Sequence, residues 1–363
     1  MEGRVMIMAG GTGGHVFPAL AVADELRSRG ADVFWLGTPN SFESRVVPEH
    51  GYSLEWIRIK GLRGNGLLRW LAAPFKMAIA MSQALAVIRR RKPDLVVGMG
   101  GFASGPGGLV ARLMARPLLI HEQNAVPGLT NRWLARIATV VLEAFPGSFS
   151  ADRGAKVTGN PVRPEIATIA PPVERLAGRE GPLRLLVLGG SQGAQILNEM
   201  LPAAIAGLAA DVRPLVRHQA GRDKVEATTA AYRSVGVEAE VSAFVNDMAE
   251  AYGWADLVVC RSGALTVAEL AAAGVASVLV PYPYAVDDHQ TLNGRYLADQ
   301  GAALLIPQAR FTQVALQAVL LDLDRDRNKV LQMAESARSL ALINATADVA
   351  DHCQAVLEKE VTR

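Results

Sequence analysis

The feature that most constrains the fold is an apolar run followed by a glycine-rich loop and a helix-like segment, which occurs once in each half of the chain. In the first half the apolar run 5–8 leads into the loop 10–15, Gly-Gly-Thr-Gly-Gly-His. In the second half the run 185–188 leads into the loop 189–193, Gly-Gly-Ser-Gln-Gly. Such loops present backbone N–H groups at a helix N-terminus, where phosphates bind. Two of them predict two nucleotide-binding-like domains that face a central cleft.

Length and patterning place the chain in the α/β class. It has 363 residues, 50% hydrophobic and 20% charged, whereas one domain usually holds about 100–200 residues. Short apolar runs alternate with longer helix-like segments, as in parallel strands covered on both faces. We therefore expect two doubly wound, Rossmann-like domains. The expected strands are 5–8, 33–37, 95–98, 118–120 and 140–142, then 185–188, 213–217, 237–241, 257–259 and 278–280.

The domain boundary is expected near residue 163. The motif at 158–164, Thr-Gly-Asn-Pro-Val-Arg-Pro, opens a proline-rich stretch without clear periodicity. This gives an N-terminal domain at 1–162 and a second domain at 163–340. The alanine-rich segment 341–363 is helical by propensity and could pack back on the N-terminal domain, although its sequence does not fix its partner.

Charge and cysteine usage exclude several classes of protein. A net charge of +2 gives no general attraction to nucleic acid. Cys260 and Cys353 lack the spacing of a disulfide framework or a structural zinc site and fit a reducing cytoplasm, Cys260 as a small buried residue at a strand end. The N-terminus lacks a signal-peptide pattern, and no apolar run reaches the roughly 18 residues of a spanning helix. Any membrane contact should be peripheral.

The first glycine loop departs from a dinucleotide-binding fingerprint. Val16 occupies the place of the third glycine, and residues 36–38, Leu-Gly-Thr, occupy the place of the ribose-binding acid. An NAD cofactor is therefore weakly supported, whereas a phosphate or diphosphate suits the loop; the alternative is a tight turn that needs glycine for its geometry alone. His15 closes the loop, where a neutral imidazole can accept a proton from a substrate hydroxyl. Its ordinary alternative is capping or packing.

Polar residues follow other expected strands. A second glycine cluster, 98–108, precedes a helix, and Asn124 ends the run 121–124, His-Glu-Gln-Asn. Asn124 can bond sugar hydroxyls or form an Asx turn before Pro127. In the second half, residues 262–269 run from a strand end into a helix, so that Glu269 can reach ribose hydroxyls. Residues 287–293 add a polar stretch at the same edge; N-capping is the alternative for any one of these residues.

Two further segments carry residues that could form a binding site. Asp322 and Asp324 form an Asp-x-Asp pair, which is expected on a solvated helix face rather than at a metal, and no other group has metal-ligand spacing. Residues 61–93 interleave apolar and basic side chains, and the part from Leu67 to Lys76 is expected to contact an anionic membrane surface. A buried helix with basic ends is the alternative.

With these residues in place, the chain resembles the MurG family of bacterial glycosyltransferases over nearly its whole length. The matching motifs are 10–15, 100–102, 121–124, 159–163, 189–194 and 261–266. The resemblance implies a GT-B fold and an inverting transfer of N-acetylglucosamine from UDP-N-acetylglucosamine to the muramoyl sugar of lipid I, which makes lipid II for peptidoglycan. It also implies a peripheral place on the cytoplasmic face of the cell membrane, contacts with other cell-wall synthesis proteins, and no nucleic acid partner.

The resemblance implies that the N-terminal domain, 1–162, binds the acceptor and faces the membrane, and that the second domain, 163–340, binds UDP-N-acetylglucosamine. It also implies two sets of site residues. Those of the acceptor side are Thr12, Gly13, Gly14 and Asn124, with His15 as candidate catalytic base. Those of the donor side are Arg163, Ser191, Val245, Ala264, Leu265, Thr266, Val267, Ala268, Glu269 and Gln290. Among these, Ser191 and the loop 264–266 would contact the diphosphate, Glu269 the ribose, Val245 the uracil through its backbone, and Gln290 the donor sugar. Some relatives have two adjacent glutamines at positions 289 and 290, so that His289 has no assigned role here.

The mechanism implied is direct displacement at the anomeric carbon, with no cofactor and no protein-bound metal. His15 either takes the proton of the acceptor hydroxyl or orients the acceptor diphosphate, and helix N-termini near Ser191 and Ala264 would stabilise the leaving UDP. Three alternatives remain from the sequence: a UDP-N-acetylglucosamine 2-epimerase, an NAD-dependent oxidoreductase, and a non-catalytic protein that binds sugar nucleotide for another subunit.

Overall fold

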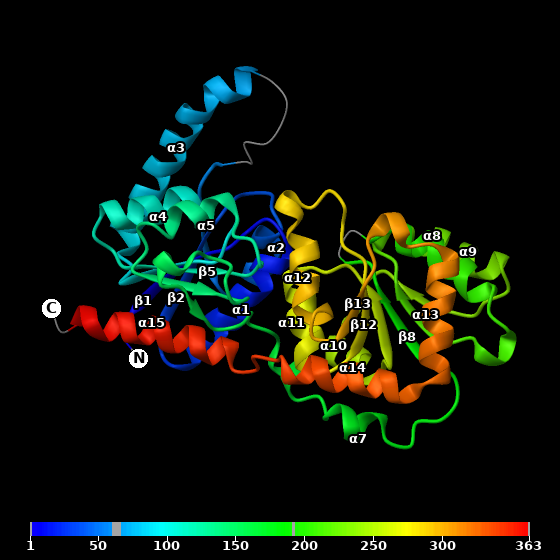
Figure 1. Ribbon diagram of the computed structural model, residues 1–363. Helices are drawn as coiled ribbons and strands as arrows, with labels where there is room; N and C mark the ends of the chain where they lie inside the picture. Colours follow the sequence, from blue (N-terminus) through cyan, green and yellow to red (C-terminus); the bar gives the residue numbers. More distant parts are fainter. Residues whose placement is uncertain (1, 60–66, 191–192, 362–363) are drawn as a thin grey trace. The chain divides into compact units, whose positions relative to one another are not determined.

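The computed structural model describes residues 2–59, 67–190 and 193–361, with the backbone alone for 67–72 and 360–361. The chain divides into two compact units (Figure 1). Unit 1 comprises residues 1–162 and 343–363, and unit 2 comprises residues 163–342. Each unit is built on one parallel sheet, and each is described by itself.

Unit 1 contains a seven-stranded sheet in the order β3-β2-β1-β4-β5-β6-β7, and every neighbouring pair is parallel. Its strands are β1 Arg4–Met8, β2 Asp32–Gly37, β3 Ser53–Trp56, β4 Leu95–Gly98, β5 Leu118–Glu122, β6 Val140–Glu143 and β7 Lys156–Val157. Its helices are α1 Gly13–Ser28, α2 Glu43–Glu49, α3 Leu67–Arg91, α4 Ser104–Leu113, α5 Leu129–Leu134 and α15 Ala345–Val361, with a 3₁₀ turn at Ala151–Arg153. The strand order reverses at β1 and β4, so that the glycine loops after these strands lie at the switch point of the sheet.

The two faces of the first sheet are buried by different helices. Val5 and Ile7 of β1 point into a core with α1 and α15, whereas Met6 and Met8 point into a core with α3, α4 and α5. This alternation follows from the two-residue period of a strand, and it explains why the whole run is apolar. Helix α15 completes the first of these cores through Val349, Ala350, Cys353, Val356 and Leu357. The partner of the C-terminal segment is therefore unit 1.

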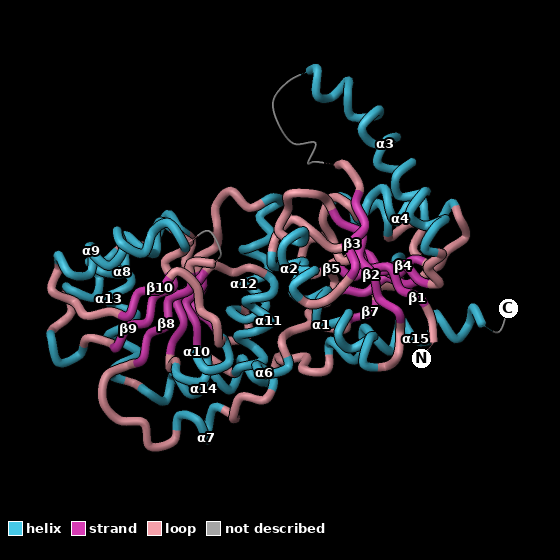
Figure 2. The backbone as a smooth tube through the Cα atoms, turned by 180° about the vertical axis from the view of Figure 1, so that it is seen from behind, coloured by secondary structure: helices cyan, strands magenta, loops and turns pink. Residues whose placement is uncertain are grey.

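Unit 2 contains a six-stranded parallel sheet in the order β10-β9-β8-β11-β12-β13. Its strands are β8 Arg184–Leu188, β9 Leu215–Gln219, β10 Glu240–Ser242, β11 Leu257–Cys260, β12 Ala276–Leu279 and β13 Ala303–Leu305. Its helices are α6 Pro164–Ala167, α7 Pro172–Leu176, α8 Gln195–Ala206, α9 Val225–Ser234, α10 Met248–Trp254, α11 Ala264–Ala273, α12 His289–Ala298, α13 Gln313–Arg325 and α14 Arg327–Ser339. Shorter 3₁₀ turns lie at Ala210–Val212, Arg222–Lys224, Val286–Asp288 and Gln308–Arg310. Helices α8 and α13 cover one face of this sheet and α10, α11 and α12 the other (Figure 2).

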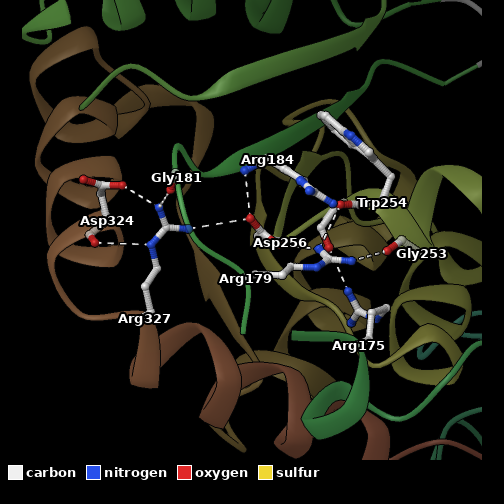
Figure 3. A network of polar contacts seen from close by, with 10 residues as sticks. Arg175, Arg179, Gly181, Arg184, Gly253, Trp254, Asp256, Asp324 and Arg327 are labelled. Carbon is white, nitrogen blue, oxygen red and sulfur yellow. Dashed lines mark hydrogen bonds and ion pairs between the residues drawn. The ribbon is translucent and has the colours of Figure 1, made fainter. Parts of the chain in front are cut away.

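The buried carboxylate of Asp256 binds the proline-rich segment after residue 163 to the rest of unit 2 (Figure 3). Asp256, whose side chain is 6% exposed, pairs with Arg179 of that segment and with Arg327 at the start of α14. It also accepts a hydrogen bond from the backbone N–H of Arg184 at 2.9 Å. Arg175 donates to the carbonyl groups of Ala255 and Gly274, and burial, followed by repulsion from Arg179, lowers the pKa of Arg175 to about 10. A segment without clear periodicity is thus fixed by arginine contacts.

The structure corrects the expected strands at five places. Strand β9 begins at Leu215 rather than at 213, because the Arg213 guanidinium donates to the carbonyl groups of Ala206 and Leu208 at the end of α8. Strand β10 covers Glu240–Ser242 instead of 237–241, although Val237 is buried in the core. Strands β3, β7 and β13 were not expected. Each is short and lies at the end of a sheet; β3 and β7 lack a continuous apolar run, whereas β13 is apolar throughout.

Candidate functional site

Two glycine loops of unit 1 lie in direct contact at the carboxyl ends of β1 and β4. Gly101 has φ +87°, and a Cβ atom there would lie 2.6 Å from the carbonyl oxygen of Gly10 and 2.7 Å from its nitrogen. Gly11 has φ +94°. Only glycine fits such a close approach between two backbones in this conformation. The loops 10–14 and 100–103 therefore form one surface that is rich in backbone N–H groups.

A buried glutamate that the sequence analysis missed holds the first loop. Glu43, 1% exposed at the start of α2, accepts hydrogen bonds from the N–H of Gly11 at 3.1 Å and from the hydroxyl of Thr38 at 2.8 Å. Burial alone would raise the pKa of Glu43, but the hydrogen bonds from Thr38 and from backbone N–H groups outweigh it and lower this pKa. The carboxylate thus binds the loop itself, in a region where a dinucleotide-binding protein directs an acid toward ribose.

His15 is the third residue of α1, and Gln123 and Gly100 contact the Nδ1 edge of its ring. Its Nδ1 lies 2.8 Å from Oε1 of Gln123, which follows β5. The ring also packs on Gly100, where a Cβ atom would lie 2.8 Å from Nδ1. Its backbone N–H donates to the carbonyl of Thr12, the N-cap of the helix. The side chain of His15 therefore contacts Gln123 rather than capping the helix.

Asn124 lies in a turn organised by the buried Glu122 at the end of β5. One oxygen of Glu122 accepts from the backbone N–H and the side-chain amide of Asn124, at 2.9 and 3.1 Å. The other accepts from the N–H of Gly128 and the amide of Asn131, at 3.1 and 2.9 Å. Asn124 therefore lies in a turn at this edge of the sheet, and its contact with a sugar hydroxyl stays a prediction. Glu143 holds the next loop in the same way, through the N–H groups of Gly147 and Phe149.

In unit 2 the glycine loop after β8 is fixed by Gln219 at the end of β9. Its side-chain amide donates to the carbonyl of Gly190 at 2.9 Å and accepts from the N–H of the same residue at 3.0 Å. Gly193 has φ +68°, and a Cβ atom there would lie 2.0 Å from the carbonyl oxygen of Ala220. Lys224, which the sequence analysis did not single out, donates to the carbonyl of Gly193 at 3.3 Å. Ser191, the predicted diphosphate contact, lies outside the described residues.

Helix α11 presents an uncapped N-terminus at the end of β11. Its N-cap is Gly263, which carries no side chain, so the first-turn N–H groups around Ala264, Leu265 and Thr266 have no side-chain cap. An uncapped helix N-terminus of this kind attracts a phosphate group. Val267 is fully buried in the core, whereas Ala268 is half-buried.

Glu269 and Arg163 lie together in unit 2. Arg163, just before α6, donates to Oε1 of Glu269 at 2.8 Å, and the Tyr252 hydroxyl donates to Oε2 at 3.1 Å. Glu269 is 4% exposed, and burial raises its pKa although the charge of Arg163 opposes this shift. A carboxylate has about four acceptor sites, so these two partners leave capacity for hydroxyl donors.

The remaining predicted donor-side residues lie in two loops. Gln290, in the first turn of α12, accepts a hydrogen bond from the N–H of Tyr282 at 2.9 Å, which orients its amide. Val245 is half-buried in the loop between β10 and α10. His289 has its Nδ1 2.7 Å from the carbonyl of Val286 and so closes the turn that contains Asp287 and Asp288, both at positive φ.

The acidic pair Asp322 and Asp324 and the two cysteines do not form a metal site in the described part of the chain. Within residues 2–59, 67–190 and 193–361, no three histidine, cysteine or acidic residues form a cluster that could hold a metal ion. Asp322 is exposed and paired with Lys329, as expected for a solvated face. Asp324 differs, because its side chain is 20% exposed and pairs with Arg327 beside Asp256. Cys260 and Cys353 are buried free thiols, and Cys260 ends β11 as expected.

The family of the chain follows from comparison with known proteins. Residues 5–143 match the glycosyltransferase family 28 N-terminal domain, and residues 184–353 match the C-terminal domain of that family. Two curated relatives, from Marinobacter nauticus and Chromohalobacter salexigens, are 55% and 57% identical over 350 and 351 residues. These alignments span 96% of this chain and 96% of each relative. Both are named UDP-N-acetylglucosamine–N-acetylmuramyl-(pentapeptide) pyrophosphoryl-undecaprenol N-acetylglucosamine transferase.

Solved structures agree with this assignment. The crystal structure of MurG from Acinetobacter baumannii superposes with a TM-score of 0.86 at 46% identity, covering 97% of this chain and 99% of that one. The calicheamicin glycosyltransferase CalG4 superposes with a TM-score of 0.68 at 18% identity, covering 99% of each chain, and so shows the fold alone. The expected GT-B fold of two Rossmann-like domains is confirmed. The chain belongs to glycosyltransferase family 28, and within it to the MurG family of N-acetylglucosamine transferases.

Proposed function

We propose that this chain transfers N-acetylglucosamine from UDP-N-acetylglucosamine to the muramoyl sugar of lipid I, which yields lipid II and UDP. The observation that carries this proposal is the identity of 55–57%, over nearly the full length, with transferases named for that donor and acceptor. The 2-epimerase, oxidoreductase and non-catalytic alternatives have no comparable support.

On the donor side, we assign UDP-N-acetylglucosamine to unit 2. The uncapped N-terminus of α11 and the glycine loop after β8 suit the diphosphate, and Glu269 suits the ribose hydroxyls. Gln290 would bind hydroxyls of the donor sugar, and the backbone of Val245 would meet the uracil. Lys224 beside Gly193 adds a positive charge near the same loop. These fixed N–H dipoles and charges would stabilise the diphosphate as it leaves.

On the acceptor side, we assign lipid I to the glycine surface of unit 1. Thr12, Gly13 and Gly14 begin α1, so their backbone suits the acceptor diphosphate, and Asn124 lies in the turn after β5. His15 would accept the proton of the attacking sugar hydroxyl as the carbon–oxygen bond to UDP breaks. Attack from the side opposite to the leaving group inverts the anomeric carbon.

Acceptor-dependent transfer is the direct test of this function. Radiolabelled UDP-N-acetylglucosamine should pass its sugar to a soluble lipid I analogue, with no labelled product when the analogue is omitted. An epimerase would convert the nucleotide sugar without any acceptor, and an oxidoreductase would change the absorbance of a nicotinamide cofactor. Either of these results, or sugar-nucleotide binding without turnover, would contradict the proposal.

Glu269→Gln should weaken donor binding. The variant keeps the shape of the side chain but removes the charge, and hydrogen bonds to charged groups are worth about 1.5–3 kcal/mol. We therefore expect the Kd for UDP to rise by about 10-fold or more, as measured by isothermal titration calorimetry. Glu250→Gln is the matched control, since Glu250 is an exposed acid of α10 that pairs with Arg217. If the two variants bind UDP with equal affinity, Glu269 does not bind the ribose.

We also propose that unit 1 binds the cytoplasmic face of the membrane peripherally. Phe75 and Ile79 of α3 are 73% and 52% exposed, and Lys76 lies beside them. On α4 and α5, Leu113 and Trp133 are 72% and 60% exposed, and the guanidinium of Arg136 lies 4.4 Å from the Trp133 ring centre. Apolar side chains among cations suit an anionic lipid surface. No helix in the described parts of the chain has the length and apolar character needed to span a membrane.

The double variant Phe75→Ser with Ile79→Ser should lose membrane binding. Burying one such side chain in lipid contributes about 1.5–3 kcal/mol, so we expect partitioning to fall at least about 10-fold. Sedimentation with vesicles containing phosphatidylglycerol measures this partitioning. Val314→Ser is the control, because Val314 is 73% exposed on α13 of unit 2. Partitioning equal to wild type would rule out this part of α3 as a membrane contact.

A further inference from the structure

A chain of hydrogen bonds leads from the backbone of unit 1 to the ring of His15. Nε2 of His121 lies 2.9 Å from the carbonyl oxygen of Gly159. Nδ1 of His121 lies 3.2 Å from the side-chain nitrogen of Gln123, and Oε1 of Gln123 lies 2.8 Å from Nδ1 of His15. His121 is fully buried and Gln123 is 1% exposed, so water does not compete for the contacts between these two residues.

The two carbonyl groups along this chain fix the direction of every hydrogen bond in it. A carbonyl can only accept, so the proton of His121 lies on Nε2 and its Nδ1 carries a lone pair. The side-chain nitrogen of Gln123 also lies 3.3 Å from the backbone carbonyl of His121, so this end of the amide must be the NH₂ group. Its oxygen therefore faces His15 and requires a proton on Nδ1 of His15.

Burial keeps His121 in the neutral form that this chain requires. Desolvation lowers the pKa of His121 to about 4, although the hydrogen bond to Gly159 opposes the shift and the nearby His15 adds to it. A neutral His121 can accept from Gln123, whereas an imidazolium would present a proton to the NH₂ group. At neutral pH the direction of the chain is therefore unchanged.

We propose that His121 and Gln123 are positioning residues that fix the tautomer of His15, with the proton on Nδ1 and the lone pair on Nε2. This inference rests on the proposed role of His15 as the base. The partner of one ring nitrogen decides which nitrogen carries the proton, and only the unprotonated nitrogen can accept one. Gly100 takes part because a side chain there would collide with the Nδ1 edge of the ring.

The test measures the tautomer directly and separately from activity. In protein labelled with ¹⁵N-histidine at pH 8, Nε2 of His15 should give a pyridine-type signal and Nδ1 a pyrrole-type signal. The chain has six histidines, and His15→Gln identifies the pair that belongs to His15. In Gln123→Met, which has similar volume but no acceptor, we expect both signals to move toward the average of the two tautomers.

Activity provides the second measurement. We expect Gln123→Met to lower kcat by at least about 10-fold, because general base catalysis contributes about 10²–10⁴-fold, with KM for UDP-N-acetylglucosamine within about twofold of wild type. Gln123→Glu should retain the proton on Nδ1 and recover kcat relative to Gln123→Met, since its carboxylate still accepts from His15. Tyr232→Phe is the control, because it removes a partner at 2.9 Å from another buried histidine, His218 of unit 2.

The possible outcomes separate this inference from the proposed function. Unchanged ring signals in Gln123→Met would overturn the positioning role, whether or not kcat falls. Shifted signals with unchanged kcat would also overturn it. Wild-type protein that shows the expected tautomer but no acceptor-dependent transfer would instead contradict the proposed function. If Gln123→Met does not fold, the tautomer in Gln123→Glu decides, and loss of its Nδ1 proton signal would overturn the role.

Discussion

His15→Ala should lower kcat by about 10²–10⁴-fold, the usual contribution of a general base. The variant removes the imidazole but leaves the backbone of α1 and its hydrogen bond to Thr12 in place. Donor binding should change little, because the residues assigned to UDP-N-acetylglucosamine belong to unit 2. Steady-state kinetics with a soluble lipid I analogue at saturating donor measures kcat.

His50→Ala is the matched control for this result. Its side chain is exposed after α2, and only its backbone carbonyl takes part in the hydrogen bond from Arg27. This control should retain wild-type kcat. If His15→Ala instead raised KM for the acceptor and left kcat unchanged, His15 would orient the acceptor diphosphate rather than take the proton.

Asp256→Ala should cost about 3–5 kcal/mol of the free energy of unfolding of unit 2. Removing one partner of a buried ion pair leaves the other charges without compensation. Here Arg179 and the N–H of Arg184 would lose their carboxylate partner, whereas Arg327 would keep its ion pair with Asp324 (Figure 3). Guanidinium chloride unfolding, followed by a signal from unit 2, measures the change.

Asp322→Ala is the control for Asp256→Ala. Asp322 is also paired, with Lys329, but its side chain is 57% exposed, and surface ion pairs contribute little. Its unfolding midpoint should stay close to that of wild type. An Asp256→Ala variant as stable as this control would show that the arginines find other acceptors, such as the carbonyl groups of Gly253 and Trp254 that already bind Arg179.

Patterns local in sequence predicted the central strands and the glycine loops. Apolar runs such as 5–8 and 257–259 appear as β1 and β11 because strands buried on both faces must be apolar throughout. This rule did not predict every strand at the edge of a sheet. Strand β3, for example, is exposed or half-buried along Ser53–Trp56, so its sequence carries no continuous apolar signal.

Contacts between distant residues account for what the sequence did not reveal about the site. Glu43 binds the N–H of Gly11 across 32 positions, and Gln123 binds His15 across 108 positions. Nothing in the local pattern around either residue specifies such a partner. The motif 121–124 was singled out for Asn124, although Gln123 makes the contact to His15. Acidic residues that fold a loop and acidic residues that bind a ligand look alike in sequence.

The return of α15 to unit 1 has a consequence for synthesis on the ribosome. Unit 2 is one continuous stretch, 163–342, and can fold as soon as it emerges. Unit 1 cannot complete its core until the end of synthesis, because Val349, Cys353 and Leu357 of that core are made last. A nascent chain stalled before residue 343 would therefore expose the apolar face of α1, and this half-finished unit would be the one most in need of a chaperone.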